Sequence, residues 1–227
     1  MKFVVTAGPT REYLDPVRFL SNPSTGKMGF AVARAAAMRG HEVALVAGPV
    51  SLKTPKGVRR IDVTSAREML AAVEEEMSKA KSGKPTVFVA TAAVADWRPA
   101  KCAARKLKKG QMSDTLKLVR NPDILKEIGR RTKTVHSSNH SLTHSPTYLV
   151  GFAAETNDVI AEARRKCREK NLDMIVANDV TEKGSGFGVD TNRVTFVRKD
   201  GSVERLPLMT KLAVARRIVR ECEDLRP

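Results

Sequence analysis

The sequence predicts an α/β fold with a Rossmann-like, doubly wound and mainly parallel sheet. Short apolar runs typical of buried strands, such as residues 2–7 and 86–90, alternate with longer segments of helical periodicity. The connections between them are short, and the strands at 2–7 and 43–46 are both followed by Gly-Pro. This alternation favours parallel strands joined by right-handed crossovers.

Each element has its own local signal. Ser24 and Thr25 can cap a helix that Gly40 ends, and Thr64 or Ser65 can cap another. The predicted strands are 2–7, 43–46, 61–63, 86–90, 149–152, 173–177 and a hairpin of 194–197 with 203–206. The further predicted helices are 66–81, one that begins at Asn121-Pro122-Asp123 with Pro in its first turn, 157–170 and 210–222.

Three segments lack a clear period. Residues 11–25 are expected to form a long loop. Residues of about 98–120 are expected to form a β-ribbon or flap beyond the sheet, because basic residues alternate there with leucines. The stretch of about 132–147 is rich in Ser, Thr, Asn and His and predicts a mobile surface insertion. The whole chain, 1–227, is expected to be one domain.

Composition narrows the class of protein. Hydrophobic residues make up 41% of 227, which is enough for a core, yet no apolar run approaches the roughly 20 residues of a membrane span. No signal peptide is evident, and the widely spaced Cys102, Cys167 and Cys222 predict reduced thiols. We therefore expect a cytoplasmic protein without membrane contact.

The formal charge of +16 raises the possibility of nucleic-acid binding. The positive charge is concentrated in two internal segments and not in tails. The first comprises Lys101, Arg105, Lys106, Lys108, Lys109, Lys117 and Arg120, and the second Arg164, Arg165, Lys166, Arg168 and Lys170. An enzyme that handles phosphorylated anions would carry such groups too, so charge alone does not decide between the two classes.

The stretch 21–29 is the strongest candidate for a binding site. It places small hydroxyls, an amide, a lysine and two glycines where a helix begins, and free N–H groups at a helix N-terminus favour an anion. In a doubly wound sheet, ligands bind outside the carboxyl ends of the strands. The predicted rim comprises Gly8-Pro9-Thr10, Gly48, residues 92–96, Gly151-Phe152 and Asn178.

Several familiar motifs are excluded. Met28 after Lys27 and Ser21 in the earlier Gly position rule out a Walker P-loop, and neither tyrosine is followed by Lys four residues later, which disfavours hydride transfer by a short-chain dehydrogenase. His136, His140 and His144 have helical spacing, but their surroundings disfavour a metal site. No nucleophile–base arrangement is evident.

Three residues on or near the rim allow two interpretations each. Asp96 can cap a turn or accept a hydrogen bond from a ribose hydroxyl. Phe152 can belong to the core or stack on a base, and Lys106 can be one solvated charge among many. The residue types and their positions in the sequence do not decide between these interpretations.

At this point the motifs resemble a known family, the phosphopantothenate–cysteine ligases of bacterial type. The resemblance covers nearly the whole chain in order. It rests on the blocks DPVRFLSN (15–22), STGKMG (24–29), AAVADWRP (92–99), KLKK (106–109), NPDIL (121–125), VGFAAET (150–156), NLD (171–173) and ANDV (177–180). Thr25, Pro23, Trp97 and Arg105 depart from the usual pattern, and no flavin-site motif is visible.

The resemblance implies a homodimer in coenzyme A biosynthesis, paired through the flap. The carboxylate of 4′-phosphopantothenate would attack the α-phosphate of CTP with Mg²⁺, and the amine of L-cysteine would then displace CMP from the acyl-cytidylate. By this resemblance the catalytic residues are Asn22, Lys106, Arg18 and Ala93, and the substrate is bound by Asn22, Ser24, Gly26, Lys27 and Met28. The nucleotide is bound by Gly8, Ala90, Thr91, Ala92, Asp96, Lys106, Pro122, Asp123, Ile124, Leu125, Phe152, Lys166 and Lys170.

Two alternatives remain at this level. The same ligase reaction can use ATP, or the chain can be a basic, nonenzymatic nucleic-acid-binding module. The ligase interpretation excludes nucleic acid as a partner and leaves room for a separate decarboxylase partner. The residues that would hold the metal are unknown.

Overall fold

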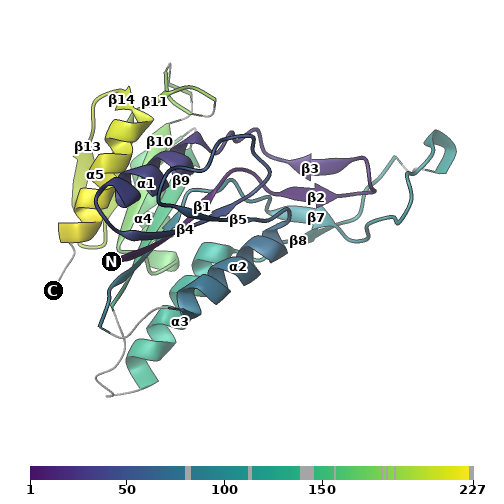
Figure 1. Ribbon diagram of the computed structural model, residues 1–227. Coiled ribbons are helices and arrows are strands. Elements are labelled where there is room, and N and C mark those ends of the chain that lie inside the picture. The colour runs from purple at the N-terminus through teal and green to yellow at the C-terminus, as the bar shows by residue number, and fades with distance from the viewer. Residues whose placement is uncertain are drawn as a thin grey trace.

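The computed structural model describes residues 1–79, 83–111, 114–138, 146–155, 157–179, 181–182, 184–186 and 188–224. The centre is an eight-stranded sheet whose strands lie in the order β13-β12-β10-β9-β6-β1-β4-β5 (Figure 1). These strands are β13 (Val203–Arg205), β12 (Val194–Arg198), β10 (Met174–Asp179), β9 (Thr147–Glu155), β6 (Thr86–Ala90), β1 (Lys2–Ala7), β4 (Glu42–Ala47) and β5 (Arg59–Asp62). All neighbours from β10 to β5 are parallel, and β12 and β13 form the predicted antiparallel hairpin at one edge. The predicted fold class is confirmed.

Helices cover both faces of this sheet. They are α1 (Lys27–Met38), α2 (Ala66–Ser78), α3 (Ile124–Ser138), α4 (Val159–Glu169) and α5 (Lys211–Asp224). Because side chains alternate along β1, Phe3 and Val5 pack with α1 and α5, whereas Val4 packs with α2, α3 and α4. The core therefore has two layers, one on each side of the sheet. Within the described ranges, no helix is long and apolar enough to cross a membrane.

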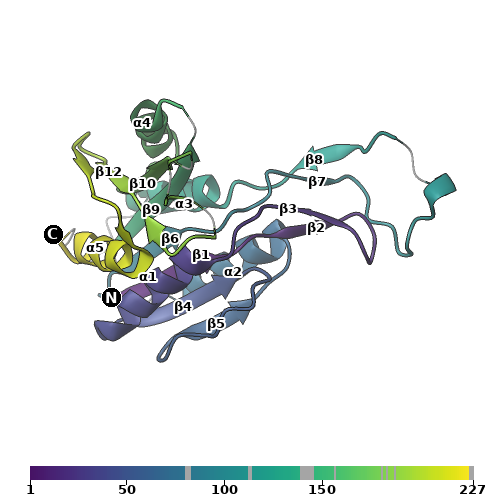
Figure 2. The ribbon, with the colours of Figure 1, turned by 90° about the horizontal axis from the view of Figure 1, so that it is seen from above.

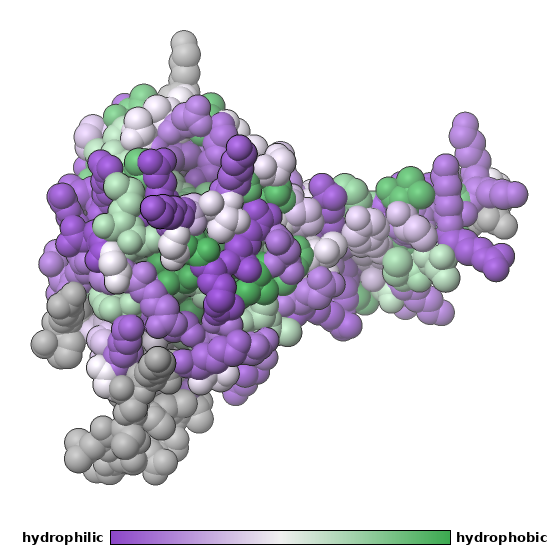
Figure 3. Space-filling view, viewed as in Figure 1, coloured by the Kyte–Doolittle hydropathy of each residue, from purple (hydrophilic) through white to green (hydrophobic). Residues whose placement is uncertain are grey.

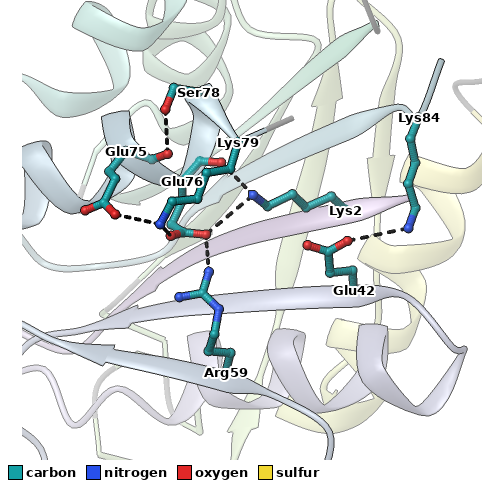
Figure 4. Close-up of polar contacts among 8 residues, drawn as sticks. All are labelled: Lys2, Glu42, Arg59, Glu75, Glu76, Ser78, Lys79 and Lys84. Carbon is teal, nitrogen blue, oxygen red and sulfur yellow. Dashed lines mark hydrogen bonds and ion pairs between the residues drawn. The ribbon is translucent and has the colours of Figure 1, made fainter. Parts of the chain in front are cut away.

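A buried ionic cluster joins the amino end of β1 to α2 (Figure 4). The Lys2 ammonium lies 3.4 Å from the Glu76 carboxylate and donates to the Glu76 carbonyl at 2.6 Å, with both side chains almost fully buried. Arg59 and Lys79 complete the set of donors around that carboxylate. Burial by itself raises the pKa of Glu76, but the hydrogen bonds from Lys79 and Arg59 outweigh it and hold the pKa below the usual 4.5.

Glu76→Ala is expected to destabilise the protein by about 3–5 kcal/mol, because Lys2 stays buried without its counter-charge. Urea unfolding measures this change in the free energy of unfolding. Glu75→Ala on the same helix is the control, since the Glu75 carboxylate is 67% exposed and pairs only with Lys79 among the described residues. Glu75→Ala should lower the free energy of unfolding by less than about 1 kcal/mol. Since the folded-state pKa of Glu76 is depressed, its stabilisation is present above pH 4.5 and is lost as the pH falls through the folded pKa. Equal losses in the two variants would contradict this account.

Two antiparallel strand pairs run out from the body of the molecule as a long arm (Figures 1 and 2). They are β2 (Arg11–Tyr13) with β3 (Phe19–Ser21), and β7 (Trp97–Pro99) with β8 (Leu118–Arg120). The 3₁₀ turn η1 (Lys109–Gln111) lies beyond β7 and β8, at the far end of the arm. A further short pair, β11 (Thr191–Asn192) with β14 (Met209–Thr210), lies before α5.

The predicted loop over 11–25 is thus partly wrong, because residues 11–21 form a hairpin. Tyr13 packs on Phe19 with ring centroids 5.3 Å apart, and the buried Asp15 carboxylate accepts the N–H groups of Val17 and Arg18 at 2.9 Å in the turn. Strands of three residues are too short to show an alternating pattern. At the base of the hairpin the Glu12 carboxylate accepts the N–H of Ala66 at 2.9 Å, which ties the arm to the start of α2.

Both ends of α3 also differ from the prediction. Asp123 caps α3 through the N–H of Lys126 at 3.0 Å, so Pro122 precedes the helix and is not in its first turn. The same helix continues to Ser138 and so includes the first seven residues of the predicted insertion, 132–138. Residues 139–145 lie outside the described part of the chain.

Candidate active site

The candidate site lies at the carboxyl edge of the sheet, where the strand order reverses between β1 and β6. The chain passes from β1 to β4 and β5 in one direction and from β6 to β9 and β10 in the other. Such a switch point leaves a crevice between two strand ends. A bridge between Pro9 and Ala93 spans it, supported by the N–H of Ala93 donating to the Gly8 carbonyl at 2.9 Å.

Buried threonine hydroxyls fix the segment that follows β6. Thr6 Oγ1 accepts the N–H of Ala92 at 3.3 Å, and Thr10 Oγ1 accepts the N–H of Ala95 at 3.0 Å. In the other direction, the Thr91 hydroxyl donates to the Thr6 carbonyl. Residues 91–95 are therefore held against β1 by hydrogen bonds and keep their place beside the crevice.

The N-terminus of α1 opens onto the same crevice without a side-chain cap. The capping residue is Gly26, in the left-handed conformation (φ +77°), so the predicted cap by Ser24 or Thr25 is wrong. A Cβ on Gly26 would lie 3.3 Å from the backbone nitrogen of Gly8, and one on Gly29 would lie 2.5 Å from Cβ of Ala7. The close approach of α1 to β1 therefore needs glycine. Because Gly26 has no side chain to cap the helix, the N–H groups of the first turn of α1 are available to an anion.

A cavity of about 140 Å³ lies between these elements. The start of α1, residues 91–93 and the end of β9 form three of its sides, and they include the predicted residues Ser24, Gly26, Lys27, Met28, Thr91, Ala92, Ala93 and Phe152. The fourth side comes from Asn178, Gly186, Asn192 and Lys211. Of these, only Asn178 lies on the predicted rim.

Gly186, Asn192 and Lys211 line the cavity but were not predicted from the sequence, and only Lys211 has a sequence feature that indicates a role. Lys211 is the first residue of α5, where the positive end of the helix dipole disfavours a cation. A lysine at a helix start therefore indicates a specific task. Asn192 and Gly186 have no comparable signal, since they lie in a segment of short strands and turns.

Asn22 and Ala93 come together as predicted, whereas Arg18 lies elsewhere. Asn22 Nδ2 donates to the Ala93 carbonyl at 3.0 Å. Arg18 stands at the other end of β3, about 13 Å away at the rise of an extended strand. Its guanidinium pairs with Asp15 and donates to the Leu107 carbonyl at 2.8 Å, so Arg18 and the neighbouring Lys106 belong to the arm. The hydrogen bond from Arg18 is the main reason that the pKa of Asp15 lies well below its usual value.

The residues predicted to bind a nucleotide divide between the two faces of the sheet. Phe152 packs with the α1 and α5 layer and lines the cavity. The opposite layer carries Ile124 and Leu125, which are buried in its core, and Ala90. Pro122, Asp123 and Lys170 line a separate surface depression between α2, α3 and the end of α4. In that layer Lys166 pairs with Glu155, and Lys170 lies 2.8 Å from Asp123.

Asp96 lies at the start of the arm. Its side chain is exposed, and its carbonyl accepts the N–H of Asn121 at 2.8 Å. Gly8 lies under Gly26 and lets the helix approach. The roles proposed for both residues stay predictions.

No group of three or more potential metal ligands occurs among the side chains that the structure describes. Of the histidines with helical spacing, His140 and His144 lie outside the described residues, as does the side chain of His136. The three cysteines are free thiols, with Cys102 exposed and the other two buried.

A crevice at a switch point beside a helix N-terminus is typical of α/β proteins that bind phosphorylated ligands. Comparison with known proteins makes this class specific. Residues 1–225 match the family described as the DNA/pantothenate metabolism flavoprotein C-terminal domain, and the chain belongs to that family. The resemblance seen in the motifs is confirmed at this level.

Similar proteins include several coenzyme A biosynthesis bifunctional proteins named CoaBC. That of Vibrio cholerae is 48% identical over 216 residues, or 94% of this chain and 50% of its own length, and that of Bacillus subtilis is 48% identical over 98% of this chain and 51% of its own length. The chain thus spans about half the length of these curated relatives. A crystal structure of the C-terminal domain of a CoaBC protein is 41% identical, has a TM-score of 0.77 and aligns over 99% of this chain and 94% of its own.

Gly29→Ala tests the close approach of α1. Its Cβ would lie 2.4 Å from Thr91 Oγ1, so the helix must shift away from β1 and residue 91. We expect the free energy of unfolding to fall by about 1–3 kcal/mol, and an anion to bind more weakly at the start of α1. Gly110→Ala, whose Cβ would meet nothing within 4 Å, is the matched control and should stay within about 0.5 kcal/mol in thermal unfolding. If Gly29→Ala behaves like the control, the close approach has no energetic importance.

Proposed function

We propose that this chain is a phosphopantothenate–cysteine ligase that joins 4′-phosphopantothenate to L-cysteine in coenzyme A biosynthesis, by way of an acyl-cytidylate made from CTP. The observation that carries the proposal is the crevice between residues 91–93 and the open end of α1, with Asn22 hydrogen-bonded to the Ala93 carbonyl beside it. Membership in a family whose full-length relatives are named for coenzyme A biosynthesis supports it. We also propose a cytoplasmic location and a decarboxylase partner, on the same chain or separate.

The proposed chemistry proceeds in two displacements. A substrate carboxylate oxygen attacks the α-phosphate of the nucleotide, forms an acyl–phosphate anhydride and releases pyrophosphate. The amine of cysteine then attacks the acyl carbon, so that CMP leaves and the amine loses a proton. Both steps bring anions together, and the protein's part is to hold them in position and to offset their repulsion.

The residues of the crevice suit these tasks. The free N–H groups and positive dipole end of α1 suit a phosphate. Asn22 donates one amide hydrogen to Ala93, and its oxygen and second hydrogen, which have no partner among the described residues, are left for the intermediate. Because it carries no charge, it can contact an acyl phosphate without adding repulsion.

For the nucleotide, Phe152 offers an aromatic surface at the end of β9, beside residues 91–93. Lys166 and Lys170 would have to exchange Glu155 and Asp123 for a triphosphate. Mg²⁺ would enter with the nucleotide, where it supplies charge neutralisation. The described residues contain no group of three or more potential metal ligands, which fits an ion held mainly by phosphate oxygens.

The arm is our proposed dimer interface. Exposed large hydrophobic residues gather on it, and Figure 3 shows green among the purple along the arm. They are Val17, Phe19, Trp97, Leu116 and Leu118. A stable monomer has little use for such exposure on a projecting ribbon. Pairing through the arms would also bring Arg18 and Lys106 of one copy to the crevice of the other.

Nucleotide choice is tested by pyrophosphate release with CTP or ATP, together with 4′-phosphopantothenate, cysteine and Mg²⁺. We expect turnover with CTP and at least tenfold less with ATP. Reactions without phosphopantothenate are the control. A preference for ATP would reverse the choice of nucleotide, and the absence of turnover with both would refute the ligase. In that event, salt-sensitive binding of nucleic acid without binding of CTP would favour the alternative based on the +16 charge.

Asn22→Asp is expected to release pyrophosphate but to form product at least 100-fold more slowly, because a carboxylate repels the acyl phosphate in the second step. The accumulated acyl-nucleotide is detected by mass spectrometry of a quenched reaction. Ser21→Ala, which removes the neighbouring hydroxyl bonded to the Thr10 carbonyl at 2.7 Å, is the control and should retain both steps. Normal product formation by Asn22→Asp would show that this amide has no part in the second displacement.

Complementation tests the arm. If Arg18 acts in the partner's crevice, then mixing inactive Arg18→Ala with inactive Asn22→Ala gives heterodimers that carry one intact site. In a two-fold dimer with random exchange, about a quarter of the wild-type activity should return. Each variant alone, at the same total concentration, is the control. No recovery after verified subunit exchange would place both residues in the same copy's site.

A further inference from the structure

Lys211 is buried and forms no direct ion pair within the described part of the chain. Its residue is 7% exposed, and its ammonium donates to the Gly186 carbonyl at 3.0 Å. No carboxylate forms an ion pair with it among the residues that the structure describes. Burying an unpaired ammonium is costly, and burial is the main reason that the pKa of Lys211 is lowered. The neighbouring Lys27 ammonium lowers this pKa further, and the Asp190 carboxylate opposes the shift only in part.

The acidic residue that acts on the charge of Lys211 is Asp190, and its carboxylate forms an ion pair with another lysine, Lys27. Lys27 Nζ lies 2.8 Å from Asp190 Oδ1 and 2.8 Å from the Gly188 carbonyl. The charge of Lys27 is therefore partly offset within the protein. Of the two lysines that line the crevice, Lys211 is the one whose charge is left for a ligand.

Two amides beside Lys211 add further donors. Asn192 is 3% exposed, and its oxygen accepts the Gly186 N–H at 3.4 Å and the Ser185 hydroxyl at 2.8 Å. The oxygen of Asn178 also faces that hydroxyl, at 2.7 Å, and the single hydroxyl hydrogen serves one of the two at a time. Fixing the amide oxygens in this way leaves the amide nitrogens, which have no acceptor in the described part of the chain, for the crevice.

The crevice is thus lined on opposite sides by donors: the N–H groups of α1 on one, an ammonium and two amides on the other. No carboxylate lies among its described lining residues. Such a site selects an anion with several acceptor oxygens. A cavity of about 140 Å³ accepts a phosphate monoester with the first atoms of its alcohol, whereas a whole nucleotide would extend beyond it.

We propose that Lys211, supported by Asn178 and Asn192, is the specificity-determining residue that binds the 4′-phosphate of phosphopantothenate and so distinguishes it from pantothenate. This inference rests on the proposed function for the identity of the substrate. The phosphate supplies the counter-charge that Lys211 lacks. Lys27 instead holds the loop at 188–190 beside the site.

Lys211→Met tests this role, because it keeps the aliphatic stem and removes the charge. We expect the dissociation constant for 4′-phosphopantothenate to rise roughly 10- to 100-fold in calorimetry, as for loss of a charge-assisted hydrogen bond. Weak binding of pantothenate, and the KM values for CTP and cysteine, should change less than about twofold. Arg216→Met, which removes an exposed charge from the same helix, is the matched control and should change none of these.

Three results would overturn the proposal: unchanged binding of phosphopantothenate, an equal loss for pantothenate, or a selective rise in the KM for CTP. Thermal unfolding checks that the variants fold. Where Lys211→Met does not fold, Asn192→Asp answers the same question, since its isosteric carboxylate keeps the bonds to Ser185 and Gly186 but pairs with Lys211 and repels a phosphate. Normal binding of phosphopantothenate by folded Asn192→Asp would also overturn it.

Binding without turnover separates this inference from the proposed function. If the wild-type protein binds 4′-phosphopantothenate but makes no product with any nucleotide, the ligase proposal fails and the phosphate site stands. If product forms normally in Lys211→Met at low phosphopantothenate, the ligase stands and the role of Lys211 fails.

Discussion

The close contact between the start of α1 and the end of β1 is the constraint on which the rest of the site depends. Gly26 lies on the backbone of Gly8, and Gly29 lies against Ala7 and Thr91. With any side chain at these positions the helix would move outward, and its free N–H groups would no longer face the crevice. The hydroxyls of Thr6 and Thr10 accept hydrogen bonds from the segment that follows β6. The ends of β1 and β6 and the start of α1 are therefore fixed relative to one another.

The sequence was sufficient for this part of the site because glycines, small hydroxyls and strand ends have local signatures. Residues 24–28 and 91–93 were predicted and do line one cavity. Lys211 and Asn192 reach that cavity only through the packing of α5 on α1 and the pairing of β11 with β14, which are contacts between distant parts of the chain. No local pattern encodes such a contact. The hairpin at 11–21 was missed for a different reason, since its strands are too short to show a period.

The arm explains why residues of one motif can lie far apart. Asp15 to Asn22 are adjacent in sequence, yet the hairpin carries Arg18 outward and returns Asn22 to Ala93, which lines the crevice. Arg18 is already paired with Asp15 and bonded to Leu107, so within one chain it fixes the arm. A function in binding therefore requires either a second copy of the chain or a change in these contacts, and the exposed hydrophobic residues of the arm favour a second copy.

The distribution of charge within the site matters more than the total of +16. Asp190 is held by Lys27, Asp123 by Lys170 and Glu155 by Lys166, so each of these carboxylates near a predicted binding residue is bound by a lysine. The crevice itself is lined by N–H groups, amides and the ammonium of Lys211. Such an arrangement costs folding free energy, because the Lys211 ammonium is buried with a carbonyl and no ion-paired carboxylate among the described residues. That cost is offset when an anionic ligand binds, and the bound state is then more stable than the free protein.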